Sequence, residues 1–245
     1  AEMMREGTIL VAFLHPAARP NHETVRILRD RRITALTMDG IPRTSRAQRM
    51  DALSSMSTIT GYKSVVLAAS RLPRVIPMIG TAIGTLRAAR FLIIGLGVVG
   101  LQAIATARRL GGSVQALDIR DEARASAESL GAKVVGFEVE PASLAIGEGG
   151  YARALPPEWL EKEREALAPL VAEADVVILS ALVPGEVAPV LVSEEMVRGM
   201  KRGSVIVDVA VDQGGNCALT DPGKEVWRHG VLVSGVANIP GSVPV

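Results

Sequence analysis

The sequence contains little sulfur and little aromatic chemistry. Cys217 is the only cysteine in 245 residues, which excludes an internal disulfide and a cysteine-rich zinc site and fits a reducing compartment. Aromatic residues make up 3% of the chain, so the core must be aliphatic and stacking of nucleic-acid bases on aromatic side chains is disfavoured. The formal net charge is +1, so no basic field favours nucleic acid or an anionic membrane. We therefore predict no nucleic-acid partner and no metal site.

Hydrophobic runs that would cross a membrane are also missing. The uncharged run 91–107 is near the lower length limit for a membrane helix, but three glycines interrupt it and Gln102 follows them. The N-terminus does not have the basic-then-apolar layout of a signal peptide. We therefore expect no direct membrane insertion of this segment. The chain begins at Ala1, close to a strand-like run, and stops at Val245, and we expect both ends to be cuts within a larger protein.

A glycine-rich turn organises the middle of the chain. The apolar run 90–94 is followed by Gly95, Gly97 and Gly100 in a Gly-x-Gly-x-x-Gly pattern, and then by a segment of helical character. This pattern predicts a strand, turn and helix that bind a dinucleotide, because glycines permit the tight turn, the approach of the diphosphate and close helix packing. Asp118 ends the next strand-like run, where an acid can hold the adenosine ribose. The alternative is a glycine-rich crossover in another doubly wound fold.

Strand-like and helix-like segments alternate from Arg90 to the C-terminus. This alternation predicts a Rossmann-like, doubly wound α/β fold with a parallel sheet. We expect part of a second, smaller α/β domain at 1–71, a proline- and glycine-containing linker at 72–89 and the dinucleotide-binding domain at 90–245. The expected strands are 8–13 (buried), 33–38, 91–94, 113–117, 133–137, 175–179, 204–208 and 231–236. The expected helices are 21–31, 50–70, 98–110, 121–130, 158–173 and 193–199.

The carboxyl ends of the predicted parallel strands should meet at one crevice, where open α/β sheets bind their ligands. The residues beyond these ends that we expect to face a cofactor are Ala181, Leu182, Asp212 and Asn238. The long connection before the fourth strand of this domain carries Gly150 and Tyr151, and glycines beside a tyrosine there predict a mobile flap. An insertion without a role is the alternative for that connection.

A polar stretch at 41–55 lies between apolar segments, and its spacing alone indicates a solvated loop and the start of a helix. Residues 43–55 nevertheless resemble the signature loop of the NAD(H)-binding domain of proton-translocating nicotinamide nucleotide transhydrogenase. The segments 148–152, 180–185 and 214–220 are similar to further segments of that family, and the similarity covers nearly the whole chain. Arg49 stands where the family has a small residue.

The resemblance implies that the chain binds NAD(H) and takes part in hydride transfer. The nicotinamide would be held by Arg43, Gln48, Asp51 and Ser54, with Gln48 between two nicotinamides. These side chains are suitable, because the carboxamide C=O needs a donor and its NH₂ needs an acceptor. No general acid or base is required, because no proton leaves carbon or oxygen. The residues expected to bind the rest of the cofactor are Gly95, Gly97, Val98, Val99, Gly100, Asp118, Ile119, Arg120, Gly150, Tyr151, Ala181, Leu182, Asp212 and Asn238.

Two neighbouring side chains make opposite predictions about the cofactor. Asp118 favours NAD over NADP, because a carboxylate accepts hydrogen bonds from a ribose diol and repels a 2′-phosphate. Arg120 is the opposing residue, because a nearby arginine can accept that phosphate; alternatively it is a solvated surface charge. The Asp-x-Arg pattern of the resembled family implies NAD, with the arginine near the adenosine end.

The same resemblance implies partners. NADP(H) would bind to a partner domain, and a membrane-spanning domain would couple hydride transfer from NADH to NADP⁺ to proton movement. This segment would be a peripheral part of a homodimeric complex on the cytoplasmic face of the bacterial inner membrane. It would be inactive without its partner subunits and its missing termini.

The related alanine dehydrogenases are an alternative. Phe13-Leu-His15 resembles the strand end where they place a substrate-binding histidine, and 209–215 and 236–241 look like their cofactor-contacting segments. Under that interpretation Asp212 assists catalysis in an amino-acid dehydrogenase. Otherwise His15 is structural, and Cys217 is a packing residue because no basic partner is evident. A third possibility is a non-catalytic module that binds NADH.

Overall fold

The chain divides into two compact units. A computed structural model describes residues 4–16, 21–41, 44–135, 137–147 and 150–243. The first unit comprises residues 1–56 and 184–186, and the second comprises 57–183 and 187–245. The boundary between Met56 and Ser57 falls inside a long helix, α2 (Ala52–Arg71), which was expected at 50–70.

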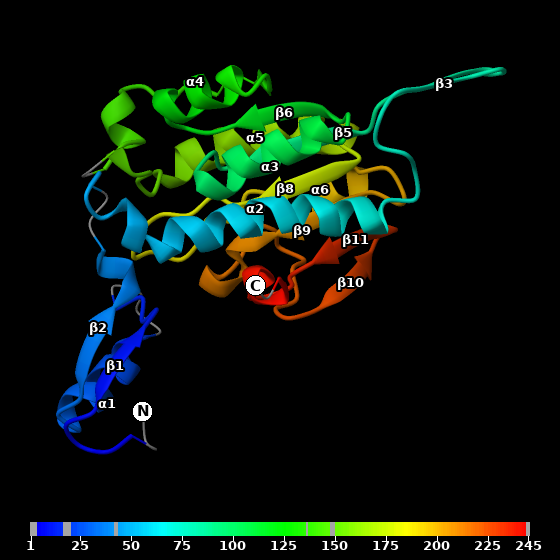
Figure 1. The fold of residues 1–245 in the computed structure, drawn as a ribbon. Helices are drawn as coiled ribbons and strands as arrows, with labels where there is room; N and C mark the ends of the chain where they lie inside the picture. The colour runs from blue at the N-terminus through cyan, green and yellow to red at the C-terminus, as the bar shows by residue number, and fades with distance from the viewer. Residues whose placement is uncertain (1–3, 17–20, 42–43, 136, 148–149, 244–245) are drawn as a thin grey trace. The chain divides into compact units, whose positions relative to one another are not determined.

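The second unit is built on a seven-stranded sheet (Figure 1). The strand order is β10-β11-β9-β8-β5-β6-β7, and every neighbouring pair is parallel except β10 with β11. The strands are β5 (Arg90–Ile94), β6 (Ser113–Leu117), β7 (Lys133–Val134), β8 (Val176–Leu179), β9 (Val205–Asp208), β10 (Glu225–Arg228) and β11 (Val231–Ser234). This arrangement confirms the predicted Rossmann-like α/β fold. The winding reverses between β5 and β8, which is where such sheets form their ligand crevice.

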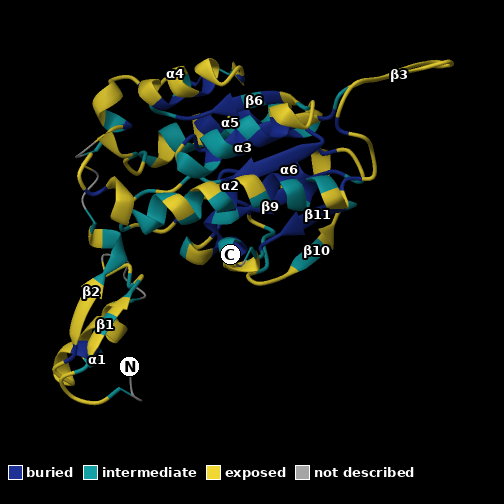
Figure 2. Ribbon diagram, in the orientation of Figure 1, coloured by how far each residue is buried: buried dark blue, intermediate teal, exposed yellow. Residues whose placement is uncertain are grey.

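Apolar side chains cover both faces of the central strands (Figure 2). In β5, Phe91 and Ile93 face one core while Leu92 and Ile94 face the other, and none is more than 1% exposed. Because both faces are buried, the strand has a continuous apolar sequence. Helices α2, α3 and α4 cover the first face, and α5 and α6 cover the second. Their bounds are α3 (Val98–Arg109), α4 (Asp121–Ser129), α5 (Pro157–Glu173) and α6 (Glu194–Gly199), close to the predicted ranges.

The edge strand β10 is absent from the sequence prediction. It joins β11 through His229 and Gly230, whose φ angles are +51° and +82°. Positive φ at both central residues is typical of the tight hairpin turn that suits twisted strands, so this dipeptide is the signal that could have identified the strand. The expected strand 231–236 ends earlier, at Ser234, and the expected strand 133–137 is observed only at Lys133–Val134.

A second unforeseen hairpin interrupts the predicted linker 72–89. Strands β3 (Ile79–Thr81) and β4 (Gly84–Leu86) pair in antiparallel register and project away from the sheet of this unit (Figure 1). Ile83 at the tip is 100% exposed. Short strands with few side chains carry too little alternation to be recognised from sequence.

The first unit contains a small parallel sheet. Strands β1 (Ile9–Ala12) and β2 (Thr34–Thr37) are connected through α1 (His22–Asp30), as the predicted β-α-β step requires. The prediction that the first strand is buried is wrong, because Ile9 and Val11 are 68% and 59% exposed. Two strands beside one short helix leave a face of the sheet uncovered.

Candidate functional site

The glycine turn between β5 and α3 is fixed by close packing. Gly95 has a φ of +86°, and a Cβ there would lie 2.5 Å from the Ala181 nitrogen. A Cβ on Gly100 would lie 2.0 Å from the Gly95 carbonyl oxygen. Gly61 in α2 contributes a third close approach, because a Cβ there would lie 2.3 Å from the carbonyl oxygen of Val99. Backbone atoms therefore hold the start of α3 against both β5 and α2.

Gly97 differs because its missing side chain faces open space. A Cβ at this position would meet no protein atom within 4 Å, and its φ of −78° suits any residue. Gly97 precedes the first turn of α3, formed by Val98 and Val99, where no side chain caps the helix. An uncapped helix N-terminus with open space before it favours anions. These residues therefore fit the diphosphate of a dinucleotide.

Asp118 lies at the carboxyl end of β6, where its side chain is 5% exposed. Its carboxylate accepts the Leu96 N–H at 2.7 Å and the Arg120 N–H at 2.8 Å. The Arg120 side chain donates two further bonds, from Nε at 3.0 Å and from Nη2 at 2.9 Å, and these raise the pKa of Arg120. The acid is placed where a ribose needs an acceptor, and it links the glycine turn to β6.

A second acid beside Asp118 is not found by sequence reasoning. Glu163 on α5 is 5% exposed, and its pKa is raised to about 7 by burial and by the charge of Asp118, against an opposing effect of Arg164. It shares the buried face of α5 with Leu167 and Val171. A glutamate in line with an apolar stripe at helical spacing is the available signal for such a site.

Asn216 connects the strand ends on the other side of β5. It is fully buried, and its Oδ1 accepts the Ala181 N–H at 3.0 Å while its Nδ2 donates to the Ala181 oxygen at 2.9 Å and the Pro189 oxygen at 2.8 Å. Its N–H donates at 2.8 Å to the buried carboxylate of Asp208, whose pKa is raised by burial despite such bonds. Asn216 and Asp208, neither of them predicted, therefore position the loop that carries Ala181.

The other predicted cofactor residues follow neighbouring strand ends, and no contact joins them in the described structure. Ile119 follows β6 and Leu182, 38% exposed, follows β8. Asp212 is exposed in a 3-10 turn after β9. Asn238 has a φ of +50° and accepts the Gly241 N–H at 3.3 Å after β11.

The predicted flap lies in the connection between β7 and α5. The Gly147 N–H donates to the Tyr151 oxygen at 2.8 Å, and Ile146 forms an isolated antiparallel bridge with Ala152. Gly150 has a φ of +77°, while residues 148–149 are outside the described part of the chain. The role of Gly150 and Tyr151 as a flap stays a prediction.

The residues expected at the nicotinamide lie before the unit boundary. Arg43 is outside the described residues. Gln48 is exposed in a 3-10 turn that precedes α2. Asp51 accepts the Ser54 N–H at 2.9 Å and the Ser54 hydroxyl at 2.7 Å, so the structure brings these two side chains together at the start of α2.

Other groups with possible chemistry lie outside this arrangement. His15 follows β1, its Nδ1 lies 2.8 Å from an oxygen of Asp39, and its ring stacks on Phe13. Cys217 is buried, which raises its pKa. Within the described residues, His, Cys, Asp and Glu side chains do not gather in threes that could hold a metal ion. The helices of that same portion of the chain include none with the length and apolar character to cross a membrane.

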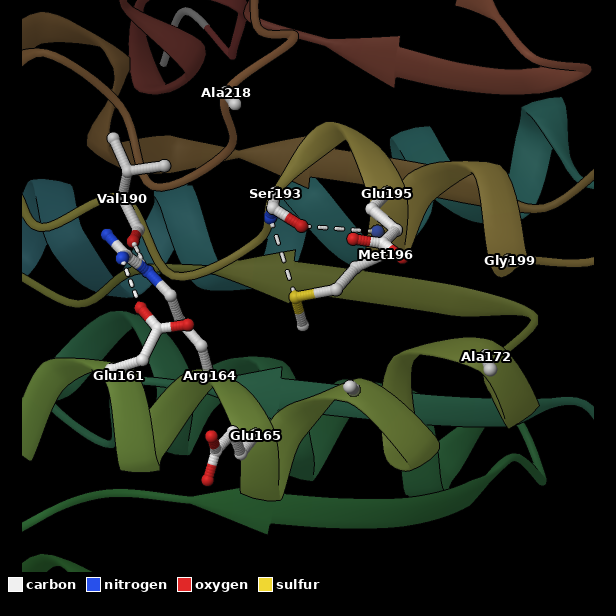
Figure 3. Close-up of a pocket in the computed structure, with 11 residues that line it drawn as sticks. Glu161, Arg164, Glu165, Ala172, Val190, Ser193, Glu195, Met196, Gly199 and Ala218 are labelled. Atoms are coloured by element: carbon white, nitrogen blue, oxygen red, sulfur yellow. Dashed lines mark hydrogen bonds and ion pairs between the residues drawn. The ribbon is translucent and has the colours of Figure 1, made fainter.

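A groove of about 700 Å³ lies between α5 and α6 (Figure 3). Arg164 crosses one end, donating to the Val190 oxygen at 2.8 Å and pairing with Glu161 at 2.9 Å. Ser193 accepts the Met196 N–H at 3.2 Å and caps α6 at the other wall. The predicted cofactor residues do not line this groove, which belongs to the side of the sheet opposite α3.

Comparisons with known proteins give consistent results. The family model for alanine dehydrogenase/PNT, C-terminal domain, matches residues 64–245, and the model for the N-terminal domain matches 1–60. An NAD(P) transhydrogenase alpha subunit of Rhodospirillum rubrum is 46% identical over 98% of the chain and 62% of its own length. A solved transhydrogenase from Sinorhizobium meliloti has a TM-score of 0.81 at 40% identity, covering 97% of this chain and 63% of that one. Alanine dehydrogenase of Bacillus subtilis is 34% identical over 98% of the chain and 58% of its own length.

Proposed function

The chain belongs to the alanine dehydrogenase/PNT family, and from this membership we propose that it is the NAD(H)-binding component of a proton-translocating NAD(P) transhydrogenase. It binds NADH and passes hydride to NADP⁺ on a partner domain. Further partners are membrane-spanning subunits at the cytoplasmic face of the bacterial inner membrane. Because the chain spans 62% of the length of its Rhodospirillum rubrum relative, the activity and partners of the whole protein are included in this proposal.

The open space before Gly97, beside Asp118, is the observation that carries NADH binding. The uncapped N-terminus of α3 offers N–H groups to a diphosphate, and the carboxylate at the end of β6 offers acceptors to a ribose. Bound NADH supplies the hydride, and the protein supplies position and electrostatics. The other predicted cofactor residues on the strand ends remain proposed contacts.

Sequence similarity favours a transhydrogenase over an alanine dehydrogenase. The identity to the Rhodospirillum rubrum subunit is 46%, compared with 34% to the Bacillus subtilis dehydrogenase. The polar loop supports the same choice, because Asp51 and Ser54 form a fixed acceptor–donor pair and Gln48 is exposed before them. We propose that these three residues, with Arg43, hold the nicotinamide in position for transfer.

The proposal is tested by partner-dependent hydride transfer. The full-length protein is mixed with a purified NADP(H)-binding transhydrogenase domain, and reduction of an NADP analogue by NADH is followed by absorbance. We expect Gln48→Ala to lower the transfer rate about tenfold, because hydride transfer requires close alignment of the two rings, while the NADH dissociation constant changes less than about twofold. Absence of partner-dependent transfer by the wild-type protein would overturn the proposal.

The His15–Asp39 pair favours an alternative function. His15 stands at the carboxyl end of β1 with its Nδ1 held by Asp39 at 2.8 Å, an arrangement that presents the other ring nitrogen to a small anionic substrate. Oxidation of NADH by pyruvate and ammonium, without a partner protein, would establish an alanine dehydrogenase-like enzyme. NADH binding with neither reaction would indicate a non-catalytic module.

The β3–β4 hairpin supports a homodimer. Met78, Ile83 and Leu86 are 69%, 100% and 50% exposed, so the arm presents apolar side chains to water. Apolar surface of this kind is typical of interaction sites. We propose that the hairpin packs against a second copy of the chain.

Charges on the arm should therefore separate the dimer. We expect Met78→Asp combined with Ile83→Asp to raise the dimer dissociation constant at least about tenfold, because the interface would have to bury carboxylates. Sedimentation velocity measures the change. Leu130→Asp, at a 38% exposed leucine after α4, is the control and should leave the oligomeric state unchanged. A double variant that sediments like the wild-type dimer would exclude the arm from the interface.

A further inference from the structure

The carboxylate of Asp118 has no acceptor position left for a ligand. A carboxylate has about four lone-pair positions. One oxygen accepts the Arg120 N–H and Nε, at 2.8 and 3.0 Å, and the other accepts the Leu96 N–H and the Arg120 Nη2, at 2.7 and 2.9 Å. A ribose diol needs two acceptors, so it must displace two of these donors.

Only the guanidinium can leave. The Leu96 and Arg120 N–H groups belong to the backbone of the glycine turn and of the loop after β6, both of which are packed in place. The Arg120 side chain is 22% exposed and can turn toward solvent. It contributes two of the bonds, which matches the two hydroxyls of the ribose.

Resting on the proposed NADH site, we propose that Arg120 occupies the ribose subsite as a displaceable counter-ion and thereby limits the preference of the cleft for NADH over NADPH. NADH must exchange a bidentate ion pair for two hydroxyl bonds, and bonds between two ionised groups are the stronger kind. A 2′-phosphate, in contrast, gives the displaced guanidinium a new anionic partner. Arg120 therefore opposes NADH and assists NADPH.

The surroundings of Asp118 strengthen this competition. Glu163 lies close enough to respond to the charge of Asp118, so departure of the guanidinium leaves two acids with less compensation. Arg124 remains nearby, but it donates to the backbone oxygens of Asp118 and Phe137 and to the Asp121 carboxylate. It does not replace Arg120 on the Asp118 carboxylate in the structure.

Dinucleotide titrations test the inference. NADH and NADPH are titrated by fluorescence into the full-length wild-type protein, Arg120→Met, Arg120→Lys and the control Arg198→Met. Arg198 lies on α6 and pairs with Glu194, away from the glycine turn. We expect Arg120→Met to bind NADH about tenfold more tightly and NADPH about tenfold more weakly, because the diol acceptors are open and the phosphate partner is gone. Arg120→Lys keeps a charge without the fork and should fall between wild type and Arg120→Met.

The outcomes separate this inference from the function on which it rests. An NADH/NADPH preference that is unchanged or reduced in Arg120→Met would overturn the inference while leaving NADH binding intact. Should Arg120→Met fail to fold, an Arg120→Lys preference equal to that of wild type would overturn it equally. Wild-type protein that binds neither dinucleotide would remove the proposed function, and the inference with it.

Discussion

Gly97→Ala is expected to weaken NADH binding about 100-fold while changing the free energy of unfolding by less than about 0.5 kcal/mol. The folded protein tolerates the methyl group, because a Cβ there meets no atom within 4 Å and the φ of −78° is ordinary. The diphosphate does not tolerate it, because it must approach the backbone at this point to reach the N–H groups of α3. Fluorescence titration gives the dissociation constant, and urea unfolding gives the stability.

A second glycine provides the matched control. Gly199 in α6 also has no atom within 4 Å of a built Cβ, but it lies beside the groove between α5 and α6. Gly199→Ala should leave NADH binding unchanged and alter stability by at most about 1 kcal/mol. Equal NADH affinities for both variants would mean that the diphosphate does not lie against Gly97.

Glu163→Gln is expected to raise the free energy of unfolding by about 3 kcal/mol at about pH 8, with almost no effect at about pH 4. Burial and the Asp118 charge raise the pKa of Glu163 from 4.5 to about 7 in the folded protein. Between these values the folded state binds more protons than the unfolded state, so stability falls as the pH rises, by about 1.4 kcal/mol per pH unit. Glutamine has the same shape and no charge to bury, so it avoids this loss.

Urea unfolding of the wild-type and variant proteins from acid to mildly alkaline pH measures the effect. Glu165→Gln is the control, because Glu165 lies on the same helix but is exposed. That variant should differ from wild type by less than about 0.5 kcal/mol throughout. Parallel stability curves for wild type and Glu163→Gln would contradict the ionisation of a buried Glu163.

Features of the site that depend on local sequence could be predicted. The turn from Gly95 to Gly100, the following helix and Asp118 all depend on residue types at fixed short spacings, and the structure places them as expected. The alternation of strands and helices was also sufficient to predict the parallel sheet. The edge strand β10 and the β3–β4 hairpin were missed, because each is short and its turn is the main signal.

Features that depend on distant contacts could not be predicted. The sequence places Arg120 two residues after Asp118, but only the fold shows that its guanidinium fills the acceptors of that acid. Asn216 gains its role because β8 and β9 are neighbours, which brings Ala181 and Pro189 within reach of its amide. The charge of Glu163 gave it the appearance of a surface residue, although α5 turns it toward the core.

A crystal structure of the protein with NADH tests the central claim most directly. We predict diphosphate oxygens within hydrogen-bonding distance of the N–H groups that begin α3, the adenosine diol on the Asp118 carboxylate, and the Arg120 side chain turned away from it. A diphosphate bound elsewhere, with the space before Gly97 filled only by water, would contradict it.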